Sequence, residues 1–268
     1  MTPPFPPHDT MPGTQLLFTT MNFVILLVVV VLLVRHSWKN RDWIPAWLLV
    51  GGCLGTLIEP VVDVVGLIWY PPNGNWTVLQ MGGIHTPLLC IPGYIWLYGG
   101  LGAIFYIFLR NGASRADVWK AFVGLMAFLA LVEFVGSGTG VYYYYGAQPL
   151  RIFNYCAYWG FINASVPVII GVAVYLLRPH VTGWRGVFVI PLVPFAIGAS
   201  FFGGGFPVYL ALNNPPLPWM VTQLAGIATA VLCTGVVWIA TRAVPVQRTT
   251  TGAADAGAAR AASTGASA

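Results

Sequence analysis

The sequence predicts an all-α membrane protein with seven transmembrane helices, and three observations support this fold class. Of the 268 residues, 57% are hydrophobic and only 7% are charged, whereas a soluble domain carries about 25% charged residues. Seven separate segments are apolar and long enough to cross a bilayer. The basic residues collect in alternate loops between these segments. Together these features predict a leading helix followed by parallel helical hairpins.

Each predicted span has about 20 residues or more, the length that a helix needs to cross the hydrocarbon core. The spans lie near residues 15–35, 43–66, 88–109, 117–137, 156–177, 186–211 and 219–241. The membrane domain is therefore expected to cover residues 15–243, after an extracytoplasmic tail at 1–14. Residues 244–268 are rich in Thr, Ala, Gly and Ser and are expected to form a disordered cytoplasmic tail.

The basic residues predict the orientation of the chain in the membrane. All but Arg151 follow an odd-numbered span: Arg35, Lys39, Arg41, Arg110, Arg115, Lys120, Arg178, Arg185, Arg242, Arg248 and Arg260. The positive-inside rule then places the N-terminus outside and the C-terminus in the cytoplasm. The net charge of +5 is scattered among inner loops, so the expected partner is a lipid bilayer, in a bacterial plasma membrane, and not a nucleic acid. Protein partners stay unknown.

One pattern occurs twice, in the second and the fourth span. The first copy is LIEPVVDVVGLIWY, residues 57–70, and the second is LVEFVGSGTGVYYY, residues 131–144. Aligning the two glutamates also aligns further positions: Glu59 with Glu133, Gly66 with Gly140, Trp69 with Tyr143 and Tyr70 with Tyr144. Both hairpins begin on the cytoplasmic side, which predicts parallel repeats at about 43–110 and 117–178. A third copy at about 186–241, around FFGGGFPVY, is left open.

Glu59, Asp63 and Glu133 are the candidate catalytic residues, because a charged side chain at a helix centre costs roughly 2.5–3.5 kcal/mol or more. All three lie in the outer half of their spans. Glu59 and Asp63 are four residues apart and share one helix face, and two such carboxyls cannot both ionise cheaply in an apolar site. At least one neutral carboxylic acid is therefore expected, able to donate a proton. The alternative is that these acids only bond neighbouring helices.

Aromatic side chains are concentrated near the acids, and ring faces stabilise cations by roughly 0.5–2 kcal/mol each. The substrate-binding residues that we predict are Trp69, Tyr70, Tyr143, Tyr144, Tyr158, Trp159, Asn163 and His85. The alternative for the aromatic residues is an interfacial belt of Trp and Tyr. A metal site would need His85 together with several acids, and the four cysteines have no metal-binding spacing. Neither a metal nor another cofactor is expected.

The stretches LIEPVVDVVGLIWYP around Glu59 and EFVGSGTGVYYYYG after Glu133 carry a resemblance to known enzymes. With its seven spans, the chain resembles the small seven-helix integral-membrane terpene cyclases of meroterpenoid pathways. The second stretch is also loosely similar to membrane carotenoid hydratases and small lycopene cyclases. The terpene cyclases are expected to carry their second acid in a late span, whereas spans six and seven here hold none.

The resemblance implies an isomerase or lyase of secondary metabolism that cyclises or hydrates a hydrophobic isoprenoid by protonating an alkene or epoxide. Glu59 would donate the proton, Asp63 would support it, and Glu133 would stabilise a cation or accept a proton. Two alternatives stay open: a proton-coupled transporter of a small molecule or lipid, which parallel repeats with intramembrane acids also suit, and a non-catalytic lipid-binding protein. The sequence does not identify the substrate.

Overall fold

The computed structural model describes residues 12–72, 76–214 and 216–244. Seven helical segments are long and apolar enough to span a membrane: Gly13–Asn40, Ile44–Gly66, Cys90–Arg110, Arg115–Gly138, Tyr158–His180, Gly183–Asn213 and Trp219–Ala243. The prediction of seven spans is confirmed, and the chain is an integral multi-pass membrane protein. Most of both predicted tails lies outside the described residues, although residues 12–14 already belong to the first helix.

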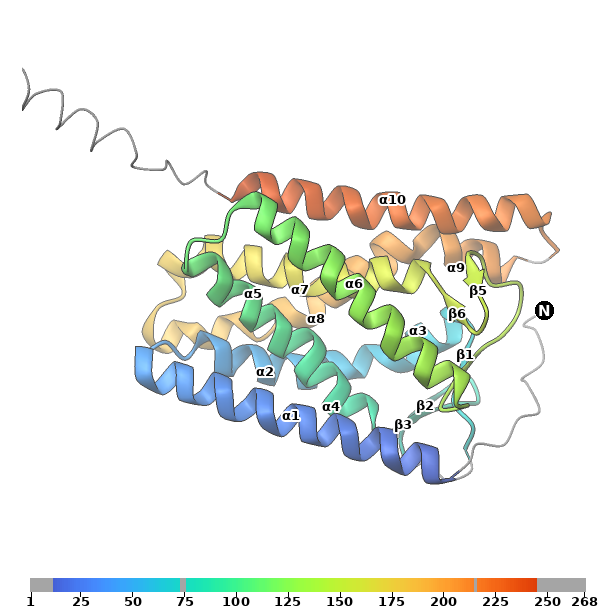
Figure 1. The fold of residues 1–268 in the computed structure, drawn as a ribbon, viewed down its shortest axis with the longest axis horizontal. Coiled ribbons are helices and arrows are strands. Elements are labelled where there is room, and N and C mark those ends of the chain that lie inside the picture. Colours follow the sequence, from blue (N-terminus) through green and yellow to red (C-terminus); the bar gives the residue numbers. More distant parts are fainter. Residues whose placement is uncertain (1–11, 73–75, 215, 245–268) are drawn as a thin grey trace, which may run out of the picture.

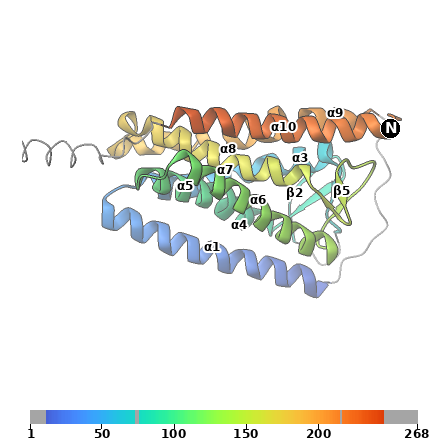
Figure 2. The ribbon, with the colours of Figure 1, turned by 45° about the horizontal axis from the view of Figure 1, so that its top comes forward.

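The helices run side by side as a bundle (Figure 1, Figure 2). Spans one, four, five and seven are each formed largely by one helix: α1 (Pro12–Asn40), α6 (Arg115–Gly138), α7 (Tyr158–Leu177) and α10 (Trp219–Ala243). Spans two, three and six are divided: α2 (Ile44–Gly55) and α3 (Glu59–Gly66); α4 (Cys90–Tyr94) and α5 (Leu101–Arg110); α8 (Leu192–Gly198) and α9 (Gly205–Asn213).

The divided spans change helix type where the sequence contains proline or glycine. A 3₁₀ turn, Thr56–Ile58, separates α2 from α3, and Pro60 lies in the first turn of α3, where a missing N–H is tolerated. π-helical segments Ile95–Gly100 and Ala199–Gly204 interrupt the third and sixth spans. Such segments occur often at functional sites. Glu59 and Asp63 therefore lie where their span is least regular, whereas Glu133 lies in the continuous helix α6.

Short strands lie at one end of the bundle, in the segments that join the second span to the third and the fourth span to the fifth (Figure 1). They form three antiparallel pairs: β1 (Ile68–Trp69) with β4 (Tyr143–Tyr144), β2 (Thr77–Met81) with β3 (Ile84–Pro87), and β5 (Arg151–Ile152) with β6 (Tyr155–Cys156). In the first pair Trp69 lies opposite Tyr143. These are equivalent positions of the two sequence copies, which is the pairing that a two-fold axis along the membrane normal would produce.

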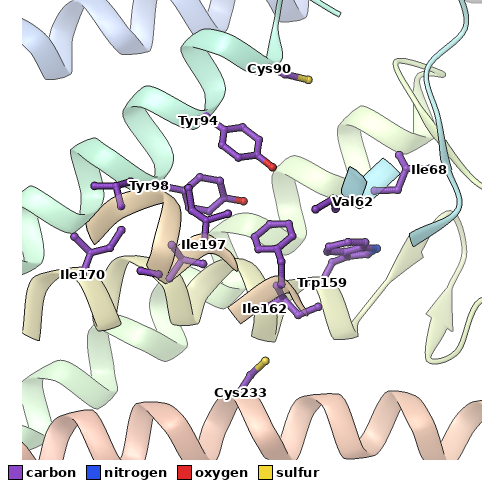
Figure 3. Packing of buried hydrophobic residues seen from close by; sticks show 14 of the residues in the cluster. Val62, Ile68, Cys90, Tyr94, Tyr98, Trp159, Ile162, Ile170, Ile197 and Cys233 are labelled. Atoms are coloured by element: carbon purple, nitrogen blue, oxygen red, sulfur yellow. The ribbon is translucent and has the colours of Figure 1, made fainter. Parts of the chain in front are cut away.

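Helix α7 is the centre of the bundle and packs against α5, α6 and α10. Much of it is buried, and small residues let neighbouring helices approach, as where Gly171 lies against Phe105. Figure 3 shows Tyr94 and Tyr98 pointing from the third span toward Trp159 of α7.

An ion pair joins the spans at the cytoplasmic end. Asp42, between α1 and α2, accepts hydrogen bonds from Arg110 and from the Tyr106 hydroxyl, the latter at 2.8 Å. Because Asp42 and Arg110 lie in or beside basic inner segments, this end is the one that the positive-inside rule assigns to the cytoplasm. The strands, and the outer halves of the spans that carry the acids, therefore lie toward the opposite membrane face.

Gly52 provides a test of the packing between α2 and the third span. A Cβ atom at Gly52 would lie 2.8 Å from the Ile95 Cα and 3.0 Å from the Tyr94 carbonyl oxygen, both backbone atoms. We expect Gly52→Ala to destabilise the protein by about 1–3 kcal/mol through overpacking, measured as a lower melting temperature in detergent. Gly124→Ala is the control, because nothing lies within 4 Å of that position. Equal melting temperatures for the two variants would contradict the packing described.

Candidate functional site

A cavity of about 140 Å³ lies between the two glutamates in the outer half of the bundle. Its walls come from α1, α3, α4, α6, α7, the π-helical segments and the strand-bearing loops. The lining residues are mostly apolar or aromatic: Phe18, Asn22, Glu59, Val62, Ile68, Tyr70, Leu89, Cys90, Gly93, Tyr94, Trp96, Leu97, Tyr98, Leu129, Val132, Glu133, Tyr142, Tyr144, Trp159, Asn163 and Phe201. The second and fourth spans thus bring their glutamates to one chamber.

Glu59 is the first residue of α3 and is 7% exposed. Its Oε2 accepts a hydrogen bond from the Tyr94 hydroxyl at 2.5 Å. Its Oε1 accepts one from the Tyr70 hydroxyl at 3.1 Å and a weaker one from the Cys90 thiol at 3.6 Å. Both oxygens of this carboxyl group are therefore acceptors, an arrangement that favours the ionised form.

Glu133 lies near the outer end of α6 and is partly buried. Two tyrosine hydroxyls donate to the same oxygen, Oε2: Tyr144 at 2.5 Å and Tyr142 at 2.8 Å. Within the described part of the chain, no hydrogen bond reaches the other oxygen, Oε1. A carboxylic acid has this pattern when its carbonyl oxygen accepts and its O–H is available to another partner.

The two glutamates share one local construction despite these differences. Tyr70 donates to Glu59 and Tyr144 donates to Glu133, in each case across 11 residues of sequence. Each tyrosine follows the end of its helix and lies in or next to the β1–β4 pair. The duplicated unit is therefore a glutamate with the tyrosine that folds back onto it, and the strand pair holds both units together.

The tyrosines of the outer loops remain hydrogen-bond donors at neutral pH. Burial is the main cause that raises the pKa of Tyr70, Tyr142 and Tyr144 well above the usual value for tyrosine. The nearby Glu133 raises the pKa of Tyr142 and Tyr144 further. Because these phenols keep their protons, each can offer one O–H group to a carboxylate or to a bound ligand.

Asp63 lies one turn after Glu59 and is fully buried. Its Oδ2 accepts a hydrogen bond from the Thr86 hydroxyl at 3.1 Å, and its Oδ1 is buried without a partner in the described structure. Asp63 is not among the residues that line the cavity. It is thus placed to influence Glu59 through charge and not to touch a ligand directly.

The structure divides the other predicted site residues into two groups. Four of them line the cavity with the glutamates: Tyr70, Tyr144, Trp159 and Asn163. Four others do not line it: Trp69, Tyr143, Tyr158 and His85. Trp69 and Tyr143 face each other in the strand pair, and the His85 ring lies 3.4 Å from the Thr77 hydroxyl in the β2–β3 hairpin. These residues shape the walls or the outer loops instead.

Several cavity residues were not selected from the sequence. The third span contributes Cys90, Tyr94 and Tyr98 at intervals of four residues, with the Tyr98 hydroxyl donating to Asn163 Oδ1 at 3.0 Å. The four-residue spacing could have identified these residues from the sequence, because it places polar groups on one face of an apolar helix. Tyr142 lies just beyond the end of the fourth span, where tyrosines of an interfacial belt are common, but its hydroxyl donates to Glu133.

Gln148 holds the two repeat loops around the cavity. Its side-chain amide donates to the Gly66 and Tyr145 carbonyl oxygens, each at 2.9 Å, and its Oε1 accepts from the Tyr158 hydroxyl at 2.8 Å. The carbonyl of Gly66 belongs to the last turn of α3, where Leu67 adopts a left-handed conformation with φ 53°. This one amide therefore links the end of α3, the loop after β4 and the start of α7.

Among the described residues, no group of three or more His, Cys, Asp or Glu side chains could hold a metal ion. Comparison of the chain with protein-family models, with curated proteins and with solved structures gives no match. The fold and the buried acid network therefore define the class: a multi-pass membrane protein with seven spanning helices and a glutamate–tyrosine chamber. The resemblance to membrane terpene cyclases remains a prediction from short motifs.

Gln148→Met tests whether the side-chain amide of Gln148 holds the loops together. Methionine fills a similar volume but cannot replace any of the hydrogen bonds. Leaving buried carbonyl groups unsatisfied costs about 1–3 kcal/mol, so we expect a clearly lower melting temperature in detergent. Gln80→Met is the matched control, since Gln80 is exposed in β2. If both variants have the melting temperature of the wild-type protein, Gln148 does not hold the loops as described.

Proposed function

We propose that this protein is a membrane-embedded cyclase or hydratase of an isoprenoid or prenylated substrate, acting by protonation of an alkene or epoxide. One observation carries the proposal: two carboxyl groups with unequal hydrogen-bonding face one aromatic cavity that lies in the membrane. Acid-initiated cyclisation needs a proton donor, a proton acceptor and a dry chamber between them. The cavity offers a residue for each role.

Glu133 is the proton donor in this proposal. Tyr142 and Tyr144 both donate to its Oε2, so the proton of the neutral acid belongs on Oε1, which has no partner in the described structure. A neutral acid in an apolar site can protonate a weak base held against it. This assignment exchanges the roles that the sequence suggested, where Glu59 was the expected donor and Glu133 the second acid.

Glu59 is the ionised partner that stabilises the cation and takes up the final proton. Tyr94, Tyr70 and Cys90 all donate to it, which compensates a negative charge removed from water. Asp63 is then neutral, because its carboxyl group is fully buried and an ionised Glu59 one turn away would repel a second negative charge. Asp63 acts as a positioning residue for the charge on Glu59.

The reaction balances without a cofactor. Transfer of the Glu133 proton to an alkene carbon, or to an epoxide oxygen with C–O cleavage, leaves a tertiary carbocation and a Glu133 carboxylate. In a cyclase, a second alkene of the substrate attacks the cation and closes a ring, and Glu59 then removes a proton to form a new alkene. In a hydratase, water adds to the cation and gives a proton to Glu59. Return of that proton to Glu133 completes the cycle.

The aromatic wall supports a cationic intermediate. Trp159 stacks on Tyr144 with ring centroids 6.2 Å apart and contacts Phe201 at 5.7 Å. Tyr98 lies edge-on to Phe201 at 5.9 Å. All four residues line the cavity, and each ring face that a cation meets contributes roughly 0.5–2 kcal/mol when water is excluded. These rings also exclude the water that would end a cascade early.

The packing of the inner half favours an enzyme over a carrier. A carrier needs a path with access from both faces. Below the cavity, side chains such as Leu48, Ala103, Ile170 and Val174 are fully buried and close-packed, and the Asp42–Arg110 pair joins the cytoplasmic ends. The chamber therefore suits a substrate that arrives from, and returns to, the outer half of the bilayer.

Glutamate substitutions test the assignment. Purified protein in nanodiscs is incubated with prenylated phenols and their terminal epoxides, and products are followed by mass spectrometry. Glu133→Gln should lower turnover by about 10²–10⁴-fold, the usual contribution of a general acid. Glu59→Gln should retain initiation but release altered products, because the cation loses its counter-charge and base.

Asp117→Asn is the control, since Asp117 caps the cytoplasmic start of α6 and lies far along the helix from Glu133. That variant should convert substrate at the wild-type rate. The proposal fails if Glu133→Gln, folded as judged by its melting curve, turns over substrate as fast as the wild-type protein.

A further inference from the structure

Two helices that make no extensive interface with each other in the described structure, α1 and α6, both contribute to the wall of the cavity. Helix α1 packs on α2, α4 and the π-helical segment, and α6 packs on α7, while α1 and α6 make no extensive interface with each other among the described residues. In the view of Figure 1, the third span lies between α1 and α6. Both helices nevertheless line the cavity, α1 through Phe18 and Asn22 and α6 through Leu129, Val132 and Glu133.

Two sets of contacts bound this gap along the membrane normal. On the outer side, Gln15 of α1 donates through Nε2 to the Val141 carbonyl oxygen at 2.7 Å. On the inner side, Trp96 donates through Nε1 to Asn22 Oδ1 at 2.8 Å and lies edge-on to Phe128 of α6 at 6.5 Å. The space between α1 and α6 is thus bounded by the Gln15–Val141 hydrogen bond on the outer side and by Trp96 on the inner side.

The space between α1 and α6 lies at hydrocarbon depth, between the outer membrane surface and the middle of the bilayer. Asn22 is ten residues into α1, which corresponds to about 15 Å at 1.5 Å per residue, within a hydrocarbon core about 30 Å thick. Its surroundings are apolar and exposed, as at Leu17, Met21, Leu131 and Val135. A molecule in the gap therefore meets acyl chains and not water.

The cavity size indicates how much of a substrate can lie inside. Its 140 Å³ is close to the volume of about 150 Å³ that accommodates one benzene molecule in an engineered protein cavity. That space holds roughly one prenyl unit next to the glutamates. A substrate with several prenyl units must therefore leave the rest of its chain outside this space, and the gap between α1 and α6 is the apolar route.

We propose that the gap framed by Gln15–Val141 and Trp96 is a lateral window, through which the hydrocarbon end of an amphiphilic polyprenyl lipid passes from the outer leaflet to Glu133. The inference rests on the proposed function for the nature of the substrate. The occupant of the window is a polyprenyl chain dissolved in the lipid. Its terminal unit lies in the cavity, and the remainder lies between α1 and α6.

Val132 provides the test variant, because it lines the cavity on α6 and is partly buried. A tryptophan at this position should fill the window. Val123→Trp is the matched control, since Val123 lies on the same helix, is 60% exposed and does not line the cavity. Leu129→Phe is a second blocking variant, and melting curves establish that each protein is folded.

The probe is a fifteen-carbon prenyl phenol with a diazirine in its chain, photolysed in nanodiscs and mapped by peptide mass spectrometry. Wild-type protein should be labelled on α1 and α6 around Phe18 and Leu129, and Val132→Trp should lower this labelling at least tenfold while Val123→Trp leaves it unchanged. Labelling elsewhere, or equal labelling of wild type and both blocking variants, overturns the window.

Turnover measured on the same samples separates the two proposals. If wild-type protein is labelled in the window but converts no prenylated substrate, the window stands and the cyclase proposal fails. If wild-type and Val132→Trp proteins convert the fifteen-carbon substrate at equal rates, the window is overturned although the catalytic proposal stands.

Discussion

The structure depends on one constraint, which is that two carboxyl groups are held in the apolar interior of a membrane bundle. Each needs hydrogen-bond donors that regular helices cannot supply, because their backbone N–H groups are already used. The donors come instead from tyrosines placed by irregular backbone: Tyr94 beside a π-helical segment, and Tyr70 and Tyr144 in or next to a strand pair. The breaks in the spans are therefore part of the site.

Two copies of one local sequence pattern give one chamber two acids with different surroundings. Each repeat carries a glutamate and a tyrosine eleven residues later, and the β1–β4 pair brings the two units together. The third span then adds Tyr94 and Cys90 to Glu59, whereas Glu133 receives Tyr142 from its own loop. A symmetric framework thus provides two carboxyl groups whose hydrogen bonds suit opposite protonation states, the condition for paired acid and base chemistry.

Much of this was predictable from hydropathy and from two intramembrane glutamates. The seven spans, the parallel arrangement and the meeting of Glu59 with Glu133 follow from patterns that are local or repeated in the sequence. The donors from the third span were missed because they depend on a change of helix register at Ile95–Gly100. Tyr70 and Tyr144 were predicted as site residues, but not as hydrogen-bond donors to the glutamates, because that role depends on pairing between distant loops. Trp69, Tyr143, Tyr158 and His85 resemble pocket residues by type and depth, yet they do not line the cavity. Trp69 and Tyr143 lie opposite each other in the strand pair, and Tyr158 donates to Gln148.

Infrared spectroscopy of the carboxyl groups tests the central claim most directly, because a neutral carboxylic acid has a C=O stretching band that a carboxylate lacks. The account predicts such bands in the wild-type protein at neutral pH, with one lost in Glu133→Gln, another lost in Asp63→Asn, and none lost in Glu59→Gln. Loss of a band in Glu59→Gln, with none lost in Glu133→Gln, would contradict the assignment of the two glutamates.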